Sequence, residues 1–441
     1  MIAVLGAGES GIGAALLAKA KNIKVFVSDF GKIKQHYKEE LENNGIDFEE
    51  GKHTEEIILS ADEIIKSPGI PETAPIVTKA KEKGIPVISE IEFASRYTNG
   101  KIIGITGSNG KTTTTLLTYE ILKNAGYDVA LAGNVGNSFA RTIAKGDHEY
   151  FVVELSSFQL DGCYEFNPNI AILLNITPDH LDRYGYEFDN YVRSKFRIVA
   201  NHTDKDYFIY WASDKVITEY LAKHNIKSVK VPFAWDKKDS QVAYVDNGVM
   251  HIHLNQKHFT MEVSQLNIKG KHNVYNSMAA AAAALACNVK DEHIRKTFAV
   301  FKGVEHRLEK YLTIRGITFV NDSKATNVNS VWYALESMDA PVVLIMGGID
   351  KGNDYSMIKD LVSKKVRAIV ALGKDNSKII NTFSSLVPVY DTHSMEEAVN
   401  KAYLVARKGD VVLLSPACAS FDLFDNYIDR GNKFKEAVRN L

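Results

Sequence analysis

The stretch "GKIIGITGSNGKTTTT", residues 100–115, decides how the central part of this 441-residue chain folds. An apolar, strand-like run leads into a glycine-rich turn, and a helix-like run follows. Gly107 and Gly110 let backbone N–H groups converge on phosphate oxygens at a helix N-terminus. Lys111 can reach the outer phosphates, and the Thr112 hydroxyl can ligate Mg²⁺. The pattern therefore predicts a nucleotide-phosphate loop in preference to a glycine turn with a surface lysine.

Composition excludes several classes of function. The 53 basic and 54 acidic residues nearly cancel, which argues against a nucleic-acid or membrane-surface binder. The three cysteines are widely spaced and form no disulfide or metal-knuckle pattern, so a reducing compartment such as the cytoplasm is expected. The longest apolar run, residues 278–287, is too short to span a bilayer. No targeting segment is recognised, and no membrane insertion is expected.

Strand-like runs alternate with helical runs along the whole chain, which predicts an α/β protein with parallel sheets. The length suggests roughly three domains of about 150 residues each. We place them at residues 1–93, 94–303 and 304–441. The expected strands lie at 2–6, 24–29, 63–69 and 86–93, then at 101–106, 150–158 and 169–177, and finally at 317–322, 341–348, 367–373 and 410–416. Residues 205–268, with an Asn-Gly turn, predict hairpins, and residues 270–286 predict a helix.

Two side chains follow buried strands in the central part. Glu154 ends the apolar run "YFVVE", and His180 lies in the loop after the next such strand. Because ligands bind at the carboxyl ends of parallel strands, both fit a metal–nucleotide site. A surface carboxylate and a solvated loop histidine are the alternatives.

Eight motifs occur in a fixed order along nearly the whole chain. They are "GSNGKTTT", "ELSSFQL", "NITPDHLDRYG", "YVRSKFRI", "GKHNVYN", "HRLE", "NDSKATN" and "SPACASFD". Together they resemble the Mur ligase family. The usual phosphate loop has a glycine where this chain has Ile105. The resemblance explains that difference, since Mur ligases share the shorter loop.

The resemblance implies a fold and an activity. The fold would be a Rossmann-like UDP-binding domain, a central P-loop ATPase-like domain and a Rossmann-like C-terminal domain. Residues in "ELSSFQL" and "NDSKATN" point to the member of the family that adds D-glutamate to UDP-N-acetylmuramoyl-L-alanine. ATP would phosphorylate the acceptor carboxylate, and the amine of D-glutamate would displace phosphate from the acyl phosphate. The product is a peptidoglycan precursor.

Residue roles follow from the same resemblance. The catalytic residues would be Lys111, Glu154, His180 and Lys195. The ATP-binding residues would be Thr106, Gly107, Ser108, Asn109, Gly110, Lys111, Thr112, Thr113, Asn276, Arg307 and Asp322. The UDP-substrate residues would be Glu9, Ser10, Asp29, Ser67, Pro68, Gly69, Asn134 and Gln159. The D-glutamate residues would be His180, Lys324, Thr326, Ser420 and Phe421.

The metal ligands implied are Thr112, Glu154, His180 and Lys195, with two Mg²⁺ ions. Lys195 would carry a CO₂-derived carbamate, which turns a cation into an oxygen ligand. On helix pattern alone, Lys195 would be a surface lysine. Cys418 is expected to be a buried structural residue, because its neighbours are small.

The first unit also permits a different interpretation. "GAGESG" fits the dinucleotide fingerprint, and Asp29 ends the second strand. That pattern alone would indicate a nicotinamide oxidoreductase, although a pyrophosphate is common to NAD and UDP ligands. The chain departs from the family at Phe30-Gly31, where the family often has Thr-Arg. This departure puts the UDP contacts there in question.

Three alternatives remain open at this point. They are a ligase of the same family that adds another amino acid, a nicotinamide oxidoreductase, and a non-catalytic nucleotide switch. The protein is expected to act as a monomer on UDP-N-acetylmuramoyl-L-alanine, D-glutamate and ATP.

Overall fold

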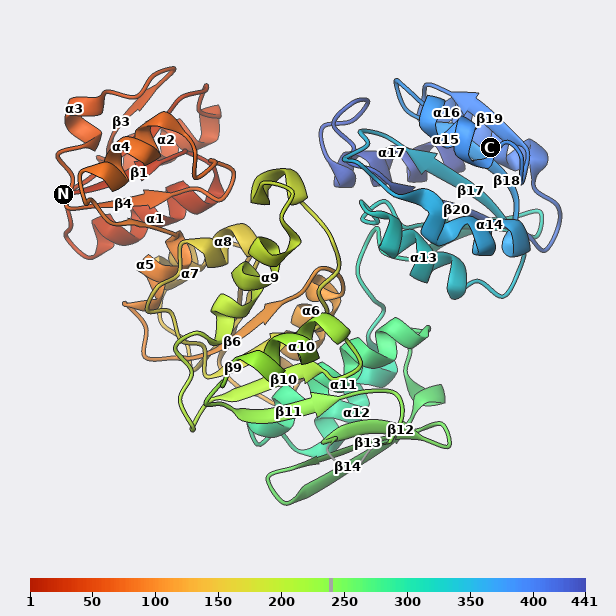
Figure 1. Cartoon of the computed structure of the whole chain (residues 1–441), viewed down its shortest axis with the longest axis horizontal. Coiled ribbons are helices and arrows are strands. Elements are labelled where there is room, and N and C mark those ends of the chain that lie inside the picture. Colours follow the sequence, from red (N-terminus) through yellow and green to blue (C-terminus); the bar gives the residue numbers. More distant parts are fainter. Residues whose placement is uncertain (238–240) are drawn as a thin grey trace. The chain divides into compact units, whose positions relative to one another are not determined.

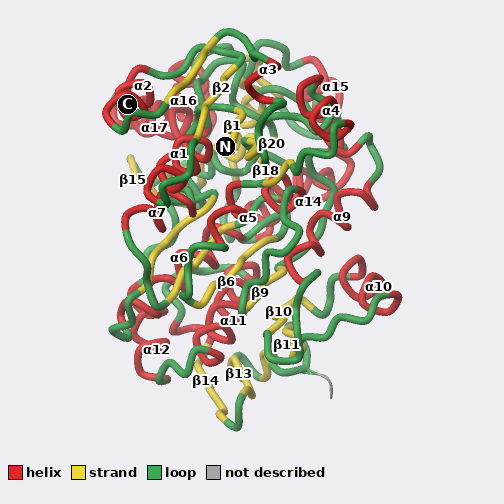
Figure 2. The backbone as a smooth tube through the Cα atoms, turned by 90° about the vertical axis from the view of Figure 1, so that its left-hand side faces the viewer, coloured by secondary structure: helices red, strands yellow, loops and turns green. Residues whose placement is uncertain are grey.

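The computed structural model describes residues 1–237 and 241–441. Its ribbon is shown in Figure 1 and its backbone, coloured by secondary structure, in Figure 2. The chain divides into two compact units. The first comprises Met1–Asn267 with Asn273–Phe301, and the second comprises Ile268–His272 with Lys302–Leu441. Each unit is described by itself.

The first unit begins with a five-stranded parallel sheet of order β3-β2-β1-β4-β5. Its middle strand β1 is apolar and fully buried in the core. The strands are β1 Ile2–Leu5, β2 Val25–Asp29, β3 Asp47–Glu50, β4 Glu63–Lys66 and β5 Val87–Ile88. The helices are α1 Glu9–Ala20, α2 Gln35–Asn43, α3 Glu55–Ile58, α4 Pro75–Glu82 and α5 Glu90–Ser95.

The same unit holds a nine-stranded sheet of order β14-β13-β12-β11-β10-β9-β6-β8-β7. The strands from β7 to β12 pair in parallel, and the β12–β13–β14 edge is antiparallel. Strands β9, β6 and β8 lie side by side inside the sheet, each with a parallel strand on both sides, which explains their unbroken apolar runs. The strands are β6 Lys101–Thr106, β7 Val129–Gly133, β8 Tyr150–Glu154, β9 Ile170–Leu173, β10 Tyr207–Trp211, β11 Val229–Phe233, β12 Ala243–Asp246, β13 Val249–Leu254 and β14 Lys257–Glu262.

Helices accompany this sheet along the chain. They are α6 Lys111–Asn124, α7 Phe139–Lys145, α8 Ser157–Asp161, α9 Phe188–Phe196, α10 Lys215–Lys223, α11 Lys271–Ala286 and α12 Asp291–Val300, with 3₁₀ turns η1 Leu181–Tyr184, η2 Arg197–Val199 and η3 Val263–Gln265. In α11 every residue from 276 to 285 is buried, because alanines leave room for neighbouring elements on all sides.

The second unit contains a six-stranded sheet of order β15-β16-β20-β17-β18-β19, parallel except for the β15–β16 pair. The strands are β15 Glu309–Ile314, β16 Ile317–Asn321, β17 Val342–Gly347, β18 Val366–Leu372, β19 Val389–Thr392 and β20 Val411–Ala417. The helices are α13 Val328–Glu336, α14 Lys359–Lys365, α15 Ser377–Phe383, α16 Met395–Val405 and α17 Tyr427–Arg439, with the 3₁₀ turn η4 Tyr355–Ile358.

Most expected strands are confirmed, but four need correction. The predicted strand 63–69 ends at Lys66, and the predicted strand 169–177 ends at Leu173. Residues 86–93 do not form one strand, because only Val87–Ile88 is extended and α5 begins at Glu90. The Ser89 hydroxyl accepts a hydrogen bond from the Glu92 backbone N–H at 3.2 Å and so caps that helix. The predicted strand 150–158 ends at Glu154, since Ser156 and Gln159 form a capping box at the start of α8.

The predicted hairpin at Asn247-Gly248 is confirmed. Asn247 has φ 48° and Gly248 has φ 77°, so both central residues of the turn have positive φ. The turn joins β12 to β13, and Asp246 pairs with Val249 across it.

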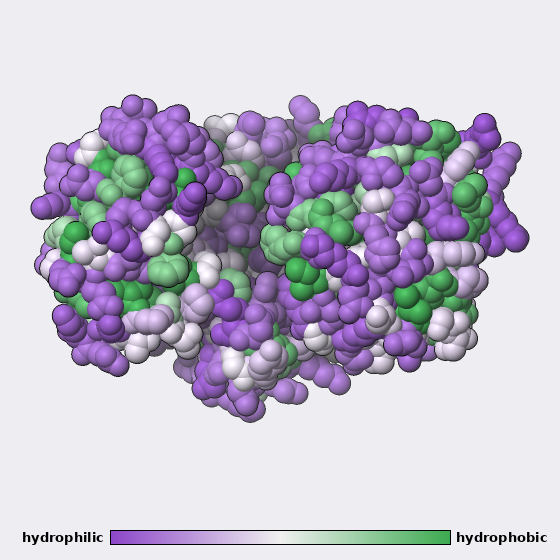
Figure 3. Space-filling model, turned by 90° about the horizontal axis from the view of Figure 1, so that it is seen from above, coloured by the Kyte–Doolittle hydropathy of each residue, from purple (hydrophilic) through white to green (hydrophobic). Residues whose placement is uncertain are grey.

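All three cysteines, Cys163, Cys287 and Cys418, are buried and unbridged. Among the described residues, we find no helix with the length and apolarity needed to cross a membrane. The face in Figure 3 is largely hydrophilic, and its hydrophobic residues form separate small groups.

Candidate functional site: the carboxyl edge of the central sheet

The loop between β6 and α6 depends on two glycines. Gly107 has φ 147° and Gly110 has φ 86°, conformations that side chains strongly disfavour. A Cβ at residue 110 would lie 2.4 Å from Oδ1 of Asn276 on α11. Both glycines are therefore required by geometry, and the loop brings the predicted residue Asn276 to its side.

Asn175, after β9, holds this loop from the neighbouring strand. Its side-chain oxygen accepts from the Asn109 N–H at 2.8 Å, and its side-chain nitrogen donates to the Asn109 carbonyl at 3.0 Å. Its backbone carbonyl accepts from the Ser108 N–H at 2.9 Å. The Ser108 hydroxyl donates to the Thr177 carbonyl at 2.8 Å and lies 3.0 Å from the Tyr191 hydroxyl. The loop is thus held by groups from two other segments, the one after β9 and helix α9. Sequence analysis missed Asn175 and Tyr191.

Lys111 is the first residue of α6. Its ammonium donates to the carbonyls of Gly107 and Ser108 at 2.8 and 2.9 Å, so it folds back over the loop. A cation held over a glycine-rich loop at the N-terminus of a helix is an arrangement that suits phosphate oxygens.

Glu154 is buried at the end of β8, directly across from Ile105 of β6. One carboxylate oxygen accepts from the Asn134 side-chain amide at 2.9 Å. The other, Oε2, is buried without a hydrogen-bond partner within the described parts of the chain. An unpaired buried carboxylate oxygen is costly unless something binds it. Carboxylate oxygens suit Mg²⁺, so this residue fits the predicted metal.

Lys195, on α9, is almost fully buried. Its ammonium donates to the Thr106 hydroxyl at 3.0 Å, at the end of β6. Burial lowers the pKa of Lys195 well below its ordinary value, and the positive charge of Lys111 lowers it further. The carboxylates of Asp179, Asp161 and Glu154 oppose these effects on the pKa. Lys195 is therefore part of the same charged cluster, and the alternative of a surface helix lysine is wrong.

His180 lies in the loop after β9, where its backbone φ of 53° is left-handed. Its side chain is 39% exposed, and Nε2 lies 3.6 Å from a carboxylate oxygen of Asp179. The ring packs edge-on against Phe158, with centroids 5.0 Å apart. His180 is thus supported by two neighbours while remaining accessible from outside.

The other predicted residues around this edge are buried or hydrogen-bonded within the protein. Thr112 and Thr113 are buried at the start of α6. The Gln159 side-chain oxygen accepts from the Ser156 N–H at 3.0 Å as part of the capping box, so this residue orients the α8 terminus. The Asn134 side chain is engaged by Glu154.

The glycine turn after β1 forms a second loop. A Cβ on Gly11 would lie 1.8 Å from the Gly6 carbonyl oxygen, so helix α1 packs tightly on the turn. Ser67, after β4, donates from its hydroxyl to the Gly6 carbonyl at 3.2 Å. Asp29 accepts from the N–H groups of Ala7 and Gly31 at 2.7 and 2.8 Å. The structure therefore gathers three of the predicted UDP-contact segments at the carboxyl edge of this sheet.

Glu9 is the first residue of α1, and its carboxylate is hydrogen-bonded to residues at α7. Its carboxylate accepts from the Ser138 N–H at 3.0 Å and from the Arg141 guanidinium at 2.8 Å, both at α7. Arg141 also pairs with Glu40. Ser10, the next predicted residue, is half-buried in the first turn of α1.

Pro68 and Gly69 lie in the loop after β4. Their carbonyls accept from the Arg183 guanidinium, each at 3.2 Å, and Arg183 stacks 4.6 Å above the Phe158 ring. Sequence analysis missed Arg183, although it lies in the "NITPDHLDRYG" motif. Phe30, where the chain departs from the family, is 74% exposed, and its ring lies 5.7 Å from the His53 ring.

In the second unit, Asp322 lies buried just after β16. It accepts from the Ser415 hydroxyl at 2.9 Å and from the Leu308 N–H at 3.2 Å. Burial raises its pKa to about 6, and the nearby charge of Arg307 opposes that rise. Nε of Arg307 is buried without a hydrogen-bond partner in the described ranges. These two predicted ATP residues are therefore brought together.

Two loops of the second unit are joined by Arg430 of α17, which sequence analysis missed. Its buried guanidinium donates to Ser323 Oγ at 3.0 Å and to the Cys418 carbonyl at 3.1 Å. It thereby joins "NDSKATN" to "SPACASFD". Burial lowers its pKa to about 10.

The four predicted D-glutamate residues of this unit lie on those two loops. The Lys324 ammonium lies 3.4 Å from the Tyr427 hydroxyl, and Thr326 is half-buried. Ser420 is buried, whereas Phe421 is 69% exposed. Cys418 is buried, as expected from its small neighbours.

The β6–α6 loop, Lys111 and the unpaired Glu154 oxygen define the class of the central part as a P-loop-type nucleotide-binding domain. The chain belongs to the Mur ligase family, because the Mur ligase MurD-like N-terminal domain matches residues 1–89, the middle domain residues 105–284 and the glutamate ligase domain residues 306–418. The expected three-part α/β architecture is thereby confirmed.

Three relatives from different organisms have the same name. The UDP-N-acetylmuramoylalanine--D-glutamate ligase of Christiangramia forsetii is 55% identical over 441 residues, covering 100% of this chain and 99% of that protein. The enzyme of the same name from Bacteroides thetaiotaomicron is 55% identical over 442 residues, with the same coverage. That from Chloroherpeton thalassium is 41% identical over 458 residues, covering 100% of this chain and 98% of its own length.

Solved structures show the same fold. The UDP-N-acetylmuramate-alanine ligase MurC from Thermotoga maritima aligns with a TM-score of 0.63 at 18% identity, covering 100% of this chain and 99% of that one. The MurF ligase from Thermotoga maritima, solved in complex with ADP, aligns with a TM-score of 0.62 at 16% identity, covering 96% and 99%.

Proposed function

We propose that this protein is an ATP-dependent ligase that joins D-glutamate to UDP-N-acetylmuramoyl-L-alanine during peptidoglycan precursor synthesis. The observation that carries the proposal is the identity of 55% along the whole chain with enzymes of that name. The geometry supports it independently, because the central sheet presents a phosphate loop, a lysine and an unpaired carboxylate oxygen at one edge.

The reaction needs an activated carboxylate, since a free carboxylate has no good leaving group. An oxygen of the acceptor carboxylate attacks the γ-phosphorus of ATP, ADP leaves, and an acyl phosphate forms. The amine nitrogen of D-glutamate then attacks the acyl carbon, inorganic phosphate leaves, and the nitrogen loses a proton. In such reactions the protein contributes mainly positioning and charge neutralisation.

Lys111 would neutralise the γ-phosphoryl oxygens, since its ammonium lies over the loop and donates to the carbonyls of Gly107 and Ser108. Thr106, Gly107, Ser108, Asn109, Gly110, Thr112, Thr113 and Asn276 would complete the phosphate contacts of this loop. Arg307 and Asp322 would contact the nucleotide from the third domain.

Mg²⁺ fits the oxygen donors of this edge. The unpaired Glu154 oxygen, the Thr112 hydroxyl and, for a second ion, His180 would hold two ions. Bound there, the ions would offset negative charge on phosphate and carboxylate oxygens.

Lys195 is proposed to carry a carbamate. The lowered pKa of Lys195 favours its neutral amine, which is the form that reacts with CO₂. The nitrogen bonds to the carbon of CO₂ and loses a proton, so a cation is replaced by an anionic oxygen donor. That change suits a site that must hold Mg²⁺.

The substrate contacts are proposed from residues at all three sheets. Glu9, Ser10, Asp29, Ser67, Pro68, Gly69, Asn134 and Gln159 would bind the UDP substrate. His180, Lys324, Thr326, Ser420 and Phe421 would bind D-glutamate. We place the domains at residues 1–93, 94–303 and 304–441, and we propose that the protein acts as a cytoplasmic monomer.

The decisive experiment measures phosphate release from ATP in the presence of UDP-N-acetylmuramoyl-L-alanine and one amino acid at a time. D-glutamate should support turnover, and L-glutamate, glycine and L-lysine should not. Release with another amino acid in preference to D-glutamate would contradict the substrate assignment. A phosphate signal independent of any amino acid would favour the nucleotide switch, and binding of NADH to the β1 loop would favour the oxidoreductase.

A further inference from the structure

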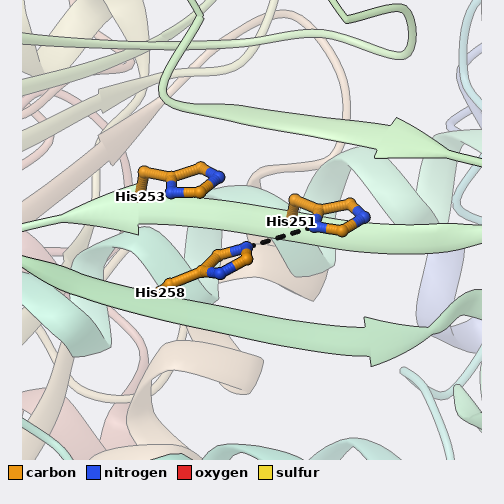
Figure 4. A group of neighbouring side chains, drawn as sticks. All are labelled: His251, His253 and His258. Atoms are coloured by element: carbon orange, nitrogen blue, oxygen red, sulfur yellow. Dashed lines mark hydrogen bonds between the residues drawn. The ribbon is translucent and has the colours of Figure 1, made fainter.

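Three histidines lie together far from the phosphate loop, on the antiparallel edge of the central sheet. His251 and His253 are on β13, and His258 is on β14 (Figure 4). In the strand order, β12, β11 and β10 separate β13 from β9. The ligase reaction therefore leaves this group unexplained.

The strand pattern places all three side chains on one face. Met250, Ile252 and Leu254 are buried, so the alternate residues of β13 point outward. His253 and His258 are exposed and directly opposite in the β13–β14 register, and His251 is one step along the same face. Cross-strand neighbours of this kind are close enough to share a ligand.

The imidazole nitrogens are close enough for one ion. One ring nitrogen from each histidine lies within 4.8 Å of the others. Nδ1 of His251 and Nε2 of His258 are 3.1 Å apart. Two nitrogens bound to one tetrahedral Zn²⁺ lie about 3.3 Å apart, given Zn–N bonds of about 2.0 Å. We propose that this β13–β14 histidine cluster binds a Zn²⁺-like divalent transition-metal ion.

The electrostatic surroundings favour neutral ligands. Partial burial lowers the pKa of both His251 and His253, and the neighbouring His258 lowers them further. Lys237 acts in the same direction on both, whereas Asp246 raises the pKa of His251. Neutral imidazole is the form that binds metal, and it suits Zn²⁺, Cu²⁺ or Ni²⁺ better than Mg²⁺.

Binding requires a modest rotation of the rings. The His253 and His258 rings are stacked at 3.9 Å with an interplanar angle of 13°, so their lone pairs run parallel. The terminal torsion of a histidine is broad, and the two rings are exposed, so one can turn toward a shared ion. The Tyr244 hydroxyl of β12 lies 3.4 Å from Nε2 of His253 and borders the cluster.

A second group has side chains close enough for a metal ion: Glu305, His306 and Glu309. These side chains already bind other side chains of the protein. The Lys435 ammonium pairs with Glu305 at 2.6 Å and with Glu309 at 2.8 Å. The His306 ring is bonded to the Asn321 side chain at 2.9 Å. In the β13–β14 cluster, by contrast, the ring nitrogens contact one another and the Tyr244 hydroxyl, and the nearby Lys237 ammonium lies over the Tyr244 ring, 5.4 Å from its centroid.

The test is calorimetric titration of Zn²⁺ into the full chain, prepared without a histidine tag and held in excess Mg²⁺ so that the oxygen-rich site is saturated. The parent should bind one equivalent of Zn²⁺. His253→Gln and His258→Gln should each weaken binding by tenfold or more, and the double variant should abolish it. His36→Gln, an exposed histidine on α2, is the matched control and should bind as the parent does.

A thermal melt with and without Zn²⁺ provides a second readout. Zn²⁺ should raise the midpoint of the parent and leave that of the double variant unchanged, because an ion that binds the folded chain stabilises it. Absence of saturable Zn²⁺ binding to the parent, or equal binding by the double variant, would overturn the proposal.

Discussion

The β1–α1 and β6–α6 loops share a layout and differ in the charge of the first helical residue and in the conformation of the N-cap glycine. Each follows the first strand of its sheet, has a glycine N-cap and opens a helix. The first helical residue is Glu9 in one and Lys111 in the other. Glu9 is held by Arg141 and the Ser138 N–H, whereas Lys111 folds over its own loop. On the proposed function, the same scaffold would hold a phosphate in the first loop and help to transfer one in the second, depending on where a cation is placed.

The largest expected effect follows from removing that cation. Lys111→Ala should reduce turnover by on the order of a hundredfold or more, because a charge contact to the transferred phosphoryl group is lost. Affinity for the UDP substrate, measured by calorimetry, should stay near that of the parent. Lys123→Ala, at the exposed end of the same helix, is the control and should leave turnover unchanged. Turnover near the parent value in Lys111→Ala would show that this loop does not perform the phosphoryl chemistry.

Lys195 sharpens the comparison, because it is a second lysine near Lys111, and burial and the charge of Lys111 both lower its pKa. Lys195→Arg keeps a cation that cannot be carbamylated, so most activity should be lost, by about tenfold or more. Lys195→Ala should also be impaired, and added acetate should restore part of its activity. The carbamate itself is checked by ¹³C NMR of protein equilibrated with labelled CO₂. An active Lys195→Arg enzyme would rule out the carbamate.

The two N-cap glycines should respond differently to the same change. Gly110→Ala forces a side chain into a left-handed conformation, at about 1–2 kcal/mol, and displaces Asn276. Gly8 has φ −85° and open space around its Cβ position, so Gly8→Ala should cost less than about 0.5 kcal/mol. Urea denaturation of both variants measures the difference. Equal stabilities would contradict the role of Gly110 as a left-handed cap.

A pH-dependent effect concerns Glu90, whose carboxyl interacts with the charge of Glu9 at the first loop. Burial and, to a smaller extent, the charge of Glu9 raise the pKa of Glu90 to about 8. The folded chain therefore keeps a proton that the unfolded chain releases near pH 4.5, the ordinary value. This contribution to the free energy of unfolding is complete below about pH 4.5 and is lost as the pH rises through about 8.

Glu90→Gln should make the free energy of unfolding depend less on pH between about pH 4.5 and 8. Its free energy of unfolding, followed by urea denaturation between about pH 5 and pH 8, should fall less steeply than that of the parent. Glu82→Gln, an exposed carboxyl on α4, should keep the parent slope. Parallel slopes for parent and Glu90→Gln would mean that Glu90 titrates normally.

Buried central strands were predictable from sequence, because continuous apolar runs such as β8 and β17 have few alternatives. The edge strands β3, β15 and β19 were missed, since their exposed faces carry polar side chains. The strand predicted at 86–93 failed where Ser89, followed three residues later by Glu92, capped a helix. That spacing is a recognisable start signal, and it could have corrected the prediction.

The site was predictable where chemistry follows a local motif. The roles of Lys111 and the loop glycines could be predicted, because they belong to one short sequence motif. Asn175 and Arg430 could not be identified in that way, because their roles arise from contacts across strands and loops distant in sequence. Burial of Lys195 is likewise a property of the packed helix α9 and not of its pattern.

The burial of the cysteines has a practical consequence for chemical labelling. Burial raises the pKa of Cys163 and Cys287 to about 12 and that of Cys418 to about 11. At neutral pH the reactive thiolate is therefore present in about one chain in ten thousand or fewer. Alkylating reagents should therefore react very slowly with the native thiols. A cysteine introduced on the surface could be labelled with a fluorophore or spin label while Cys163, Cys287 and Cys418 stay in place.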